Sequence, residues 1–177
     1  MNYGNIIYTD VANGEGCRTS LFVSGCTHHC KGCFNKCTWD FSYGDAFTKK
    51  AEDKIIESLK PDYVSGLTIL GGEPMEIANQ KVLAPFIMRI RKELPNKTIW
   101  IYSGYTWEEL NDSANKRCNC METSEILSSI DVLVDGEFME DKRNLMLKFR
   151  GSSNQRIIDV KKTLEHNRSE IILKYAS

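Results

Sequence analysis

Short apolar runs alternate with longer amphipathic segments over most of the 177-residue chain. The runs at about 19–24, 66–70, 98–102 and 130–134 have the length of buried strands and are followed by glycine-bearing turns. The segments between them repeat apolar residues at helical spacing, which predicts helices over about 48–59, 79–94, 107–110 and 124–129. Strands that alternate with helices form right-handed βαβ units, so the pattern predicts an α/β protein with a mostly parallel sheet.

The pattern weakens elsewhere in the chain. We expect one domain over residues 1–177, because this length can bury a core without dividing. The polar stretch 112–124 is predicted to be a surface insertion, and residues 157–177 a C-terminal extension. The run 145–149 is a possible strand, and 156–175 fits either a hairpin around 166–168 or a strand and a helix.

Composition excludes some partners. The chain has 23 basic and 24 acidic residues and a net charge of -1, so no overall field attracts nucleic acid or an anionic membrane. No apolar run approaches the roughly 20 residues that span a bilayer, and the N-terminus lacks the pattern of a signal peptide. We therefore expect a cytoplasmic protein whose seven cysteines are thiols or ligands.

The first strand leads directly into a C-x3-C-x2-C motif made by Cys26, Cys30 and Cys33. Three thiols on one short loop can converge on a single ion or cluster. An iron–sulfur cluster held by three thiolates keeps one iron open for a ligand, whereas structural zinc needs a fourth ligand such as Cys37. The spacing favours the cluster but leaves zinc and uncommitted thiols as alternatives.

The other strands end in turns that carry polar residues. Gly71-Gly72-Glu73-Pro74 follows the second strand, Ser103 and Gly104 follow the third, and Asp135 follows the fourth. Parallel strands bring their C-terminal ends to one edge of the sheet, where barrels and open α/β sheets bind ligands. Each turn taken alone is an ordinary turn sequence, so it is their shared edge that predicts a site.

Together, the cysteine spacing and the Gly-Gly-Glu-Pro turn resemble the radical S-adenosylmethionine enzymes, and among them the activating proteins of anaerobic (class III) ribonucleotide reductase. The resemblance covers about residues 1–111 and 130–156. It implies a single-domain, partial (open) β/α barrel of the radical S-adenosylmethionine type. The supporting stretches are 13–16, 21–26, 32–36, 38–39, 103–105, 132–136 and 150–155.

The resemblance also implies a reaction and its partners. In that family the three cysteines hold a 4Fe-4S cluster whose fourth iron binds S-adenosylmethionine. Reductive cleavage gives a 5′-deoxyadenosyl radical, which takes a hydrogen from a glycine of the large subunit of anaerobic ribonucleoside-triphosphate reductase. A low-potential protein such as flavodoxin would supply the electron.

Carried over to this chain, Cys26, Cys30 and Cys33 become the cluster ligands, and the remaining site residues contact the cofactor. Glu73 is the expected acceptor for its ammonium group, with the backbones of Gly71 and Gly72 close by. The backbone from Gly32 to Phe34 is expected near the adenine, Ser103 near the ribose or carboxylate, and Asp135 is a weaker candidate. His28 and His29 are expected to be solvated loop residues, and the other cysteines unreactive.

Alternative functions stay open at this stage. The substrate could be another glycyl-radical enzyme or a small molecule, and a non-catalytic zinc module would use Cys37 as its fourth ligand. The C-terminal third is rich in basic residues, among them Lys142, Arg143, Lys148 and Arg150. A solvated surface is the favoured interpretation of these residues, and a docking face for the reductase is the alternative.

Overall fold

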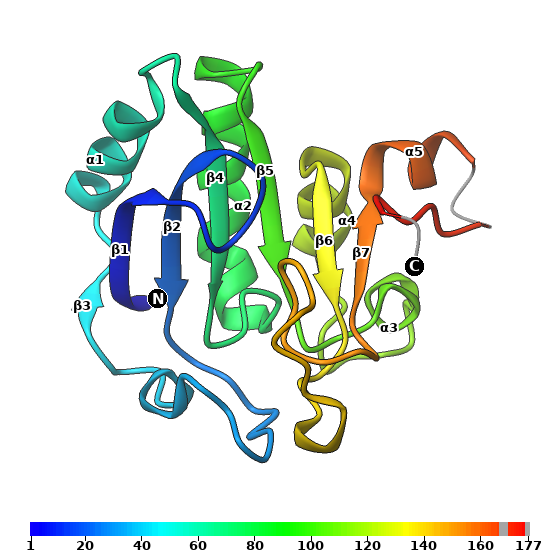
Figure 1. The fold of residues 1–177 in the computed structure, drawn as a ribbon. Helices are drawn as coiled ribbons and strands as arrows, with labels where there is room; N and C mark the ends of the chain where they lie inside the picture. Colours follow the sequence, from blue (N-terminus) through cyan, green and yellow to red (C-terminus); the bar gives the residue numbers. More distant parts are fainter. Residues whose placement is uncertain (167–169, 176–177) are drawn as a thin grey trace.

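A computed structural model describes residues 1–166 and 170–175 and shows one sheet with helices packed on it (Figure 1). In chain order the elements are β1 (Asn2–Asp10), β2 (Cys17–Val23), η1 (Lys36–Trp39), β3 (Asp45–Ala46), α1 (Lys49–Leu59), β4 (Val64–Gly71), α2 (Ile77–Glu93), β5 (Thr98–Tyr102), α3 (Trp107–Asn111), α4 (Met121–Ser129), β6 (Val132–Asp135), η2 (Glu140–Lys142), β7 (Arg156–Asp159) and α5 (Val160–Glu165).

The seven-stranded sheet has the order β3-β1-β2-β4-β5-β6-β7 and does not close on itself. Its central strands β2, β4, β5 and β6 are parallel. The outer strands β1, β3 and β7 pair antiparallel to their neighbours. The predicted α/β class and open, mostly parallel sheet are therefore confirmed, and the four parallel strands are those expected from the apolar runs.

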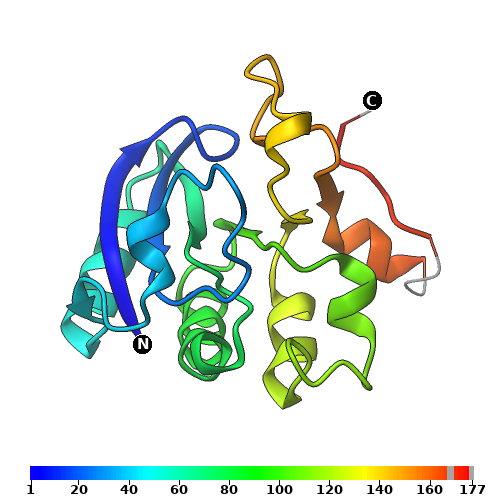
Figure 2. The same cartoon turned by 90° about the horizontal axis from the view of Figure 1, so that it is seen from below.

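Helices α1, α2 and α4 cover one face of the sheet and bury the larger core against it (Figure 2). The opposite face has a smaller core that includes Trp100, Val132, Val134 and Ile157. The turn around Gly14 and the ring of Phe149 pack on Trp100 from this side. All four parallel strands point toward the same edge, and the cysteine loop leaves β2 there (Figure 1).

Several expectations need correction. Strands β1 and β3 were not expected, and 145–149 is not a strand; only the bridge between Arg143 and Ser152 lies near it. The segment 112–124 is not wholly at the surface, because Cys118 is fully buried in the main core. Of the two readings of 156–175, the strand and helix are correct; residues 167–169 of the alternative hairpin lie outside the described part of the chain.

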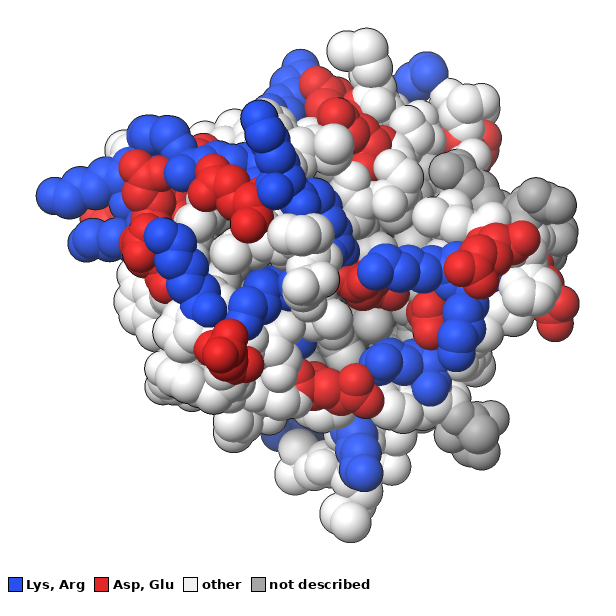
Figure 3. All heavy atoms as spheres, turned by 90° about the horizontal axis from the view of Figure 1, so that it is seen from above, with Lys and Arg blue, Asp and Glu red and all other residues white. Residues whose placement is uncertain are grey.

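Charge is spread evenly over the edge of the sheet opposite the cysteine loop. Figure 3 shows basic and acidic side chains interleaved on that face, without a broad area of one sign. This agrees with the net charge of -1. Within residues 1–166 and 170–175, no helix combines the length and apolar character needed to cross a membrane.

Candidate functional site

The start of the cysteine loop is fixed by backbone hydrogen bonds from two directions. The amide of Gly25 donates to the carbonyl of Thr38 (2.8 Å), and that of Cys26 to the carbonyl of Trp39 (3.2 Å), so η1 folds back beside β2. On the other side, the amide of Glu73 donates to the carbonyl of Gly25 at 2.8 Å. The first cysteine and the Gly-Gly-Glu-Pro turn therefore form one hydrogen-bonded unit.

A cavity of about 180 Å³ lies at this edge of the sheet. It brings together residues that follow four different strands, β2, β4, β5 and β6. Among those expected at the site, its lining includes Cys26, Cys30, Cys33, Gly71, Gly72, Glu73 and Ser103. Residues that were not expected there include His28, Trp39, Tyr102, Phe138 and Gln155. The cysteine loop and the turns after β4 and β5 thus share one hollow.

The three thiols face this cavity at different depths. Cys26 is buried, whereas Cys30 and Cys33 are partly exposed. Burial raises the pKa of the Cys26 thiol to about 12, and a cysteine that binds a metal does so as the thiolate. In the part of the chain that the structure describes, no three His, Cys, Asp or Glu side chains are gathered tightly around one point.

The donor set nevertheless fits an iron–sulfur cluster. Three soft thiols come from one loop and line one cavity, and Cys30 is joined to Cys33 by a backbone hydrogen bond of 3.1 Å. Cys37, the fourth ligand of the zinc alternative, is exposed and lies outside the lining of this cavity. The arrangement therefore favours three ligands over four.

The two glycines after β4 are required by close backbone contacts. Gly71 has φ +108°, and a Cβ there would lie 2.8 Å from the backbone of Phe22. A Cβ on Gly72 would lie 2.6 Å from the carbonyl oxygen of Gly25. Only glycine lets the turn approach the cysteine loop this closely.

Glu73 is 1 % exposed, and its carboxylate accepts hydrogen bonds from the turn after β5 as well as from its own turn. Oε1 accepts from the amide of Met75 and the hydroxyl of Ser103, both at 2.8 Å. Oε2 accepts from the amide of Gly104 at 2.6 Å. A buried carboxylate held by three donors is a fixed negative group facing the cavity.

His28 is not a solvated loop residue as expected; its side chain is 3 % exposed and lies between two carboxylates. Nδ1 lies 2.5 Å from Oε1 of Glu137. Nε2 lies 3.1 Å from Oε2 of Glu73, which is close enough for an ion pair, but its orientation does not make a hydrogen bond. Burial lowers the pKa of His28, but the two carboxylates outweigh it and the pKa lies above its ordinary value. The ring therefore lies between Glu73 and Glu137, and both carboxylates favour its protonated form.

Three expected residues lie away from this hollow. Asp135 is buried and accepts from the amide of Trp107 (2.8 Å) and from Nε of Arg156 (3.0 Å). Its neighbour Gly136 lines the cavity, but Asp135 does not. Gly32 and the 97 % exposed Phe34 line an adjoining cavity of about 470 Å³, which also contains Cys33.

Polar residues at the start of α2 also hold the site, and sequence reasoning missed them. Glu76 accepts from the amide and hydroxyl of Thr27, at 2.8 and 2.6 Å. The side-chain amide of Asn79 donates to the carbonyls of Ser24 and Glu73. Polar residues at the start of a helix, directly after the Gly-Gly-Glu-Pro turn, are the signal that could have revealed them.

Comparison with known proteins shows the family of the chain. Residues 12–158 match the family described as a 4Fe-4S single cluster domain. Over 157 residues the chain is 45% identical to the anaerobic ribonucleoside-triphosphate reductase-activating protein of Pasteurella multocida, covering 88% of this chain and 95% of that protein. The protein of the same name from Escherichia coli K12 is 41% identical, covering 88% of this chain and 96% of that protein.

A phage protein extends the comparison. The anaerobic ribonucleoside-triphosphate reductase-activating protein of Enterobacteria phage T4 is 35% identical over 159 residues, which are 89% of this chain and 93% of the phage protein. The family match over residues 12–158 includes the cysteine loop, the turn after β4 and the strand ends that line the cavity. The chain belongs to the family of anaerobic ribonucleoside-triphosphate reductase-activating proteins and has their 4Fe-4S single cluster domain.

Proposed function

We propose that this protein is a radical S-adenosylmethionine enzyme that generates the glycyl radical of anaerobic ribonucleotide reductase, and that its open sheet is the partial β/α barrel of that superfamily. The observation that carries the proposal is the shared cavity, into which three cysteines, the Gly-Gly-Glu turn and Ser103 all face. The names of the relatives support the reductase as the target.

Cys26, Cys30 and Cys33 are the proposed ligands of one 4Fe-4S cluster. When bound and reduced, the cluster would supply one electron for the cleavage of S-adenosylmethionine to methionine and a 5′-deoxyadenosyl radical, and that radical would take a hydrogen from a glycine of the reductase. The backbone hydrogen bonds of Gly25 and Cys26 fix the start of the ligand loop against η1. A low-potential donor such as flavodoxin is the proposed electron source.

Glu73 is proposed to bind the ammonium group of S-adenosylmethionine. Its carboxylate is already held by Met75, Ser103 and Gly104, so it costs little further ordering when a cation arrives. His28 now lies against the same oxygen at 3.1 Å, and we propose that it moves aside as the ammonium enters. Ser103 then acts by orienting Glu73, in addition to its predicted contact with the ribose or carboxylate.

The remaining predicted contacts are proposed at the margin of the cavity. Gly32, Cys33 and Phe34 would present backbone groups to the adenine where the cysteine cavity meets the adjoining one, because Cys33 lines both. The side chain of Asp135 is occupied by Arg156 and the amide of Trp107, so we propose that it acts by positioning Gly136, which lines the site. These residues bind and orient the cofactor and exclude water from it.

The test is cofactor cleavage by anaerobically reconstituted and reduced protein. Wild-type protein is expected to yield methionine and 5′-deoxyadenosine, and Cys30→Ala to yield neither. Cys37→Ser is the matched control, because this exposed thiol lies outside the cavity and its loss should leave iron content and cleavage unchanged. Colourless, zinc-loaded wild-type protein that loses its metal in Cys37→Ser would instead support the zinc module.

A further inference from the structure

A ridge of exposed apolar side chains stands beside the cysteine cavity. We define it as residues 143–150; its tip includes Leu145 and Met146, which are 83% and 88% exposed. Phe34 of the cysteine loop, 97% exposed, lines the same 470 Å³ cavity as Leu145. Large apolar side chains that gather around one hollow indicate an interaction site more than chance exposure.

Hydrogen bonds and a ring contact hold the base of the ridge in place. At its base the amide of Asn144 donates to the carbonyl of Gly151 (3.2 Å), and that of Ser153 to the carbonyl of Lys142 (3.0 Å). The side chain of Gln155 accepts from the amide of Gly151 at 2.8 Å. Phe149 packs edge-on against the buried Trp100, with ring centroids 5.6 Å apart. The exposed tip is therefore presented to solvent by a fixed base.

The hollow beside the ridge leads to the cysteines. The 470 Å³ cavity and the cysteine cavity share Cys33, Asn35, Leu70, Tyr102, Phe138 and Gln155 as lining residues. A chain segment lying in the larger hollow would thus reach the edge of the reaction site. Its contacts would be made with Phe34 and the cysteine loop on one side and the ridge on the other.

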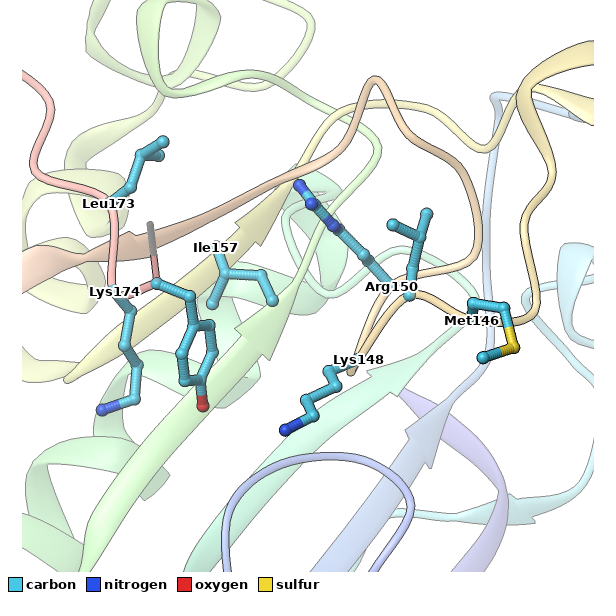
Figure 4. Close-up of a pocket in the computed structure, with 8 residues that line it drawn as sticks. Met146, Lys148, Arg150, Ile157, Leu173 and Lys174 are labelled. Atoms are coloured by element: carbon cyan, nitrogen blue, oxygen red, sulfur yellow. The ribbon is translucent and has the colours of Figure 1, made fainter. Parts of the chain in front are cut away.

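The ridge also carries unpaired positive charge. No ion pair in the described part of the chain joins a carboxylate to Arg143, Lys148 or Arg150, although Nη1 of Arg150 donates to the carbonyl of Gln155 at 2.6 Å. Figure 4 shows Lys148 and Arg150 extending from the ridge into a second hollow of about 570 Å³, where Lys174 and Ile157 also lie. The face is therefore apolar at its tip and cationic along its flank.

We propose that the 143–150 ridge is the docking surface for the reductase, and that it binds an extended segment with apolar side chains flanked by carboxylates. This rests on the proposed function, which requires a polypeptide substrate to reach the cysteine cavity. The apolar tip fits the apolar side chains, and Lys148 and Arg150 fit the carboxylates. This assigns a binding role to basic residues that composition alone leaves as solvated surface.

The test compares exposed methionines in two places. Met146→Glu and Leu145→Glu should weaken binding of the reductase about ten-fold or more, since they place charge in an apolar contact. Met121→Glu is the control, because Met121 is 87% exposed at the start of α4 and does not line either hollow. Binding is measured anaerobically, by titrating labelled reductase with the reconstituted protein.

Charge is tested in the same assay. Lys148→Glu should also weaken binding, and the defect should shrink as salt is raised, whereas Lys54→Glu on the exposed side of α1 should have little effect. Cleavage of S-adenosylmethionine without the reductase should be unchanged in all these variants. If the reconstituted wild-type protein does not cleave S-adenosylmethionine, the proposed function is refuted, whereas the binding titration still tests the ridge.

Three results would overturn the ridge proposal. In the first, the ridge variants bind the reductase as tightly as Met121→Glu does. In the second, they bind it normally but accept electrons more slowly from the protein donor, which would assign the surface to that donor. In the third, they change only the sedimentation of the isolated protein, which would assign it to a second copy of this chain.

Discussion

Replacing Glu73 by glutamine tests the proposed ammonium site with almost no change in size. The carboxylate accepts from Met75 and Ser103 through one oxygen and from Gly104 through the other. If the amide oxygen keeps the first two donors, the amide nitrogen faces the N–H of Gly104 and that bond is lost. Leaving one buried donor unsatisfied costs about 1–3 kcal/mol of folding free energy.

The effect on ligand binding should be larger than the effect on stability. An ammonium group that enters the cavity pairs with the carboxylate, and removal of one partner of a buried charge pair costs about 2–5 kcal/mol of binding free energy. At about 1.4 kcal/mol for each factor of ten, Glu73→Gln should weaken S-adenosylmethionine binding by roughly 30-fold to several thousand-fold.

The assay is equilibrium binding of S-adenosylmethionine to anaerobically reconstituted protein of equal iron content. Glu137→Gln is the matched control, since this carboxylate is the other partner of His28 but is 50% exposed. It should change affinity less than about three-fold, because an exposed pair contributes little. A folded, iron-loaded Glu73→Gln protein that binds within three-fold of wild type would refute the ammonium assignment.

The remaining predictions concern the supports of the site. Gly72→Ala should lower the iron content while the fold is retained by circular dichroism, because its Cβ would lie 2.6 Å from the carbonyl oxygen of Gly25; normal iron content would contradict this. Burial raises the pKa of Asp131, but hydrogen bonds from two cations and an amide outweigh it and the pKa lies below its usual value. The stabilisation by the ionised carboxylate is thus complete above the unfolded pKa of about 4 and is lost as pH falls through the folded pKa. In Asp131→Asn, the free energy of unfolding measured in urea should therefore depend less on pH in the acidic range. Arg156→Ala leaves the buried Asp135 without its cation and should lower the free energy of unfolding by about 3 kcal/mol. Arg156→Lys keeps a cation beside Asp135 and should lower it less.

The sequence was sufficient to predict which strand ends lie together. The apolar runs predicted the parallel strands, and parallel strands must end at one edge. That rule places the cysteine loop beside Glu73 and Ser103, and all of them line one cavity. Strand β1 escaped prediction because only Asp10 of its nine residues is buried, so the strand lacks a regular apolar alternation.

Other features depend on contacts between residues far apart in the chain. The position of His28 is set by Glu137, which lies 109 residues away, and no local pattern predicts that contact. Cys118 lies in a polar stretch, yet its thiol packs into the core and donates to the carbonyl of Glu109. The run 145–149 has the composition of a strand, but it forms the tip and side of the ridge because no neighbouring strand pairs with it within the described residues.

The most direct test of the central claim follows one hydrogen atom. Reductase carrying glycine deuterated at Cα is mixed with the reconstituted, reduced protein and S-adenosylmethionine, and the 5′-deoxyadenosine is analysed by mass spectrometry. The account predicts deuterium in the 5′-deoxyadenosine together with a glycyl radical signal on the reductase. A glycyl radical formed alongside unlabelled 5′-deoxyadenosine, or with none, would contradict it.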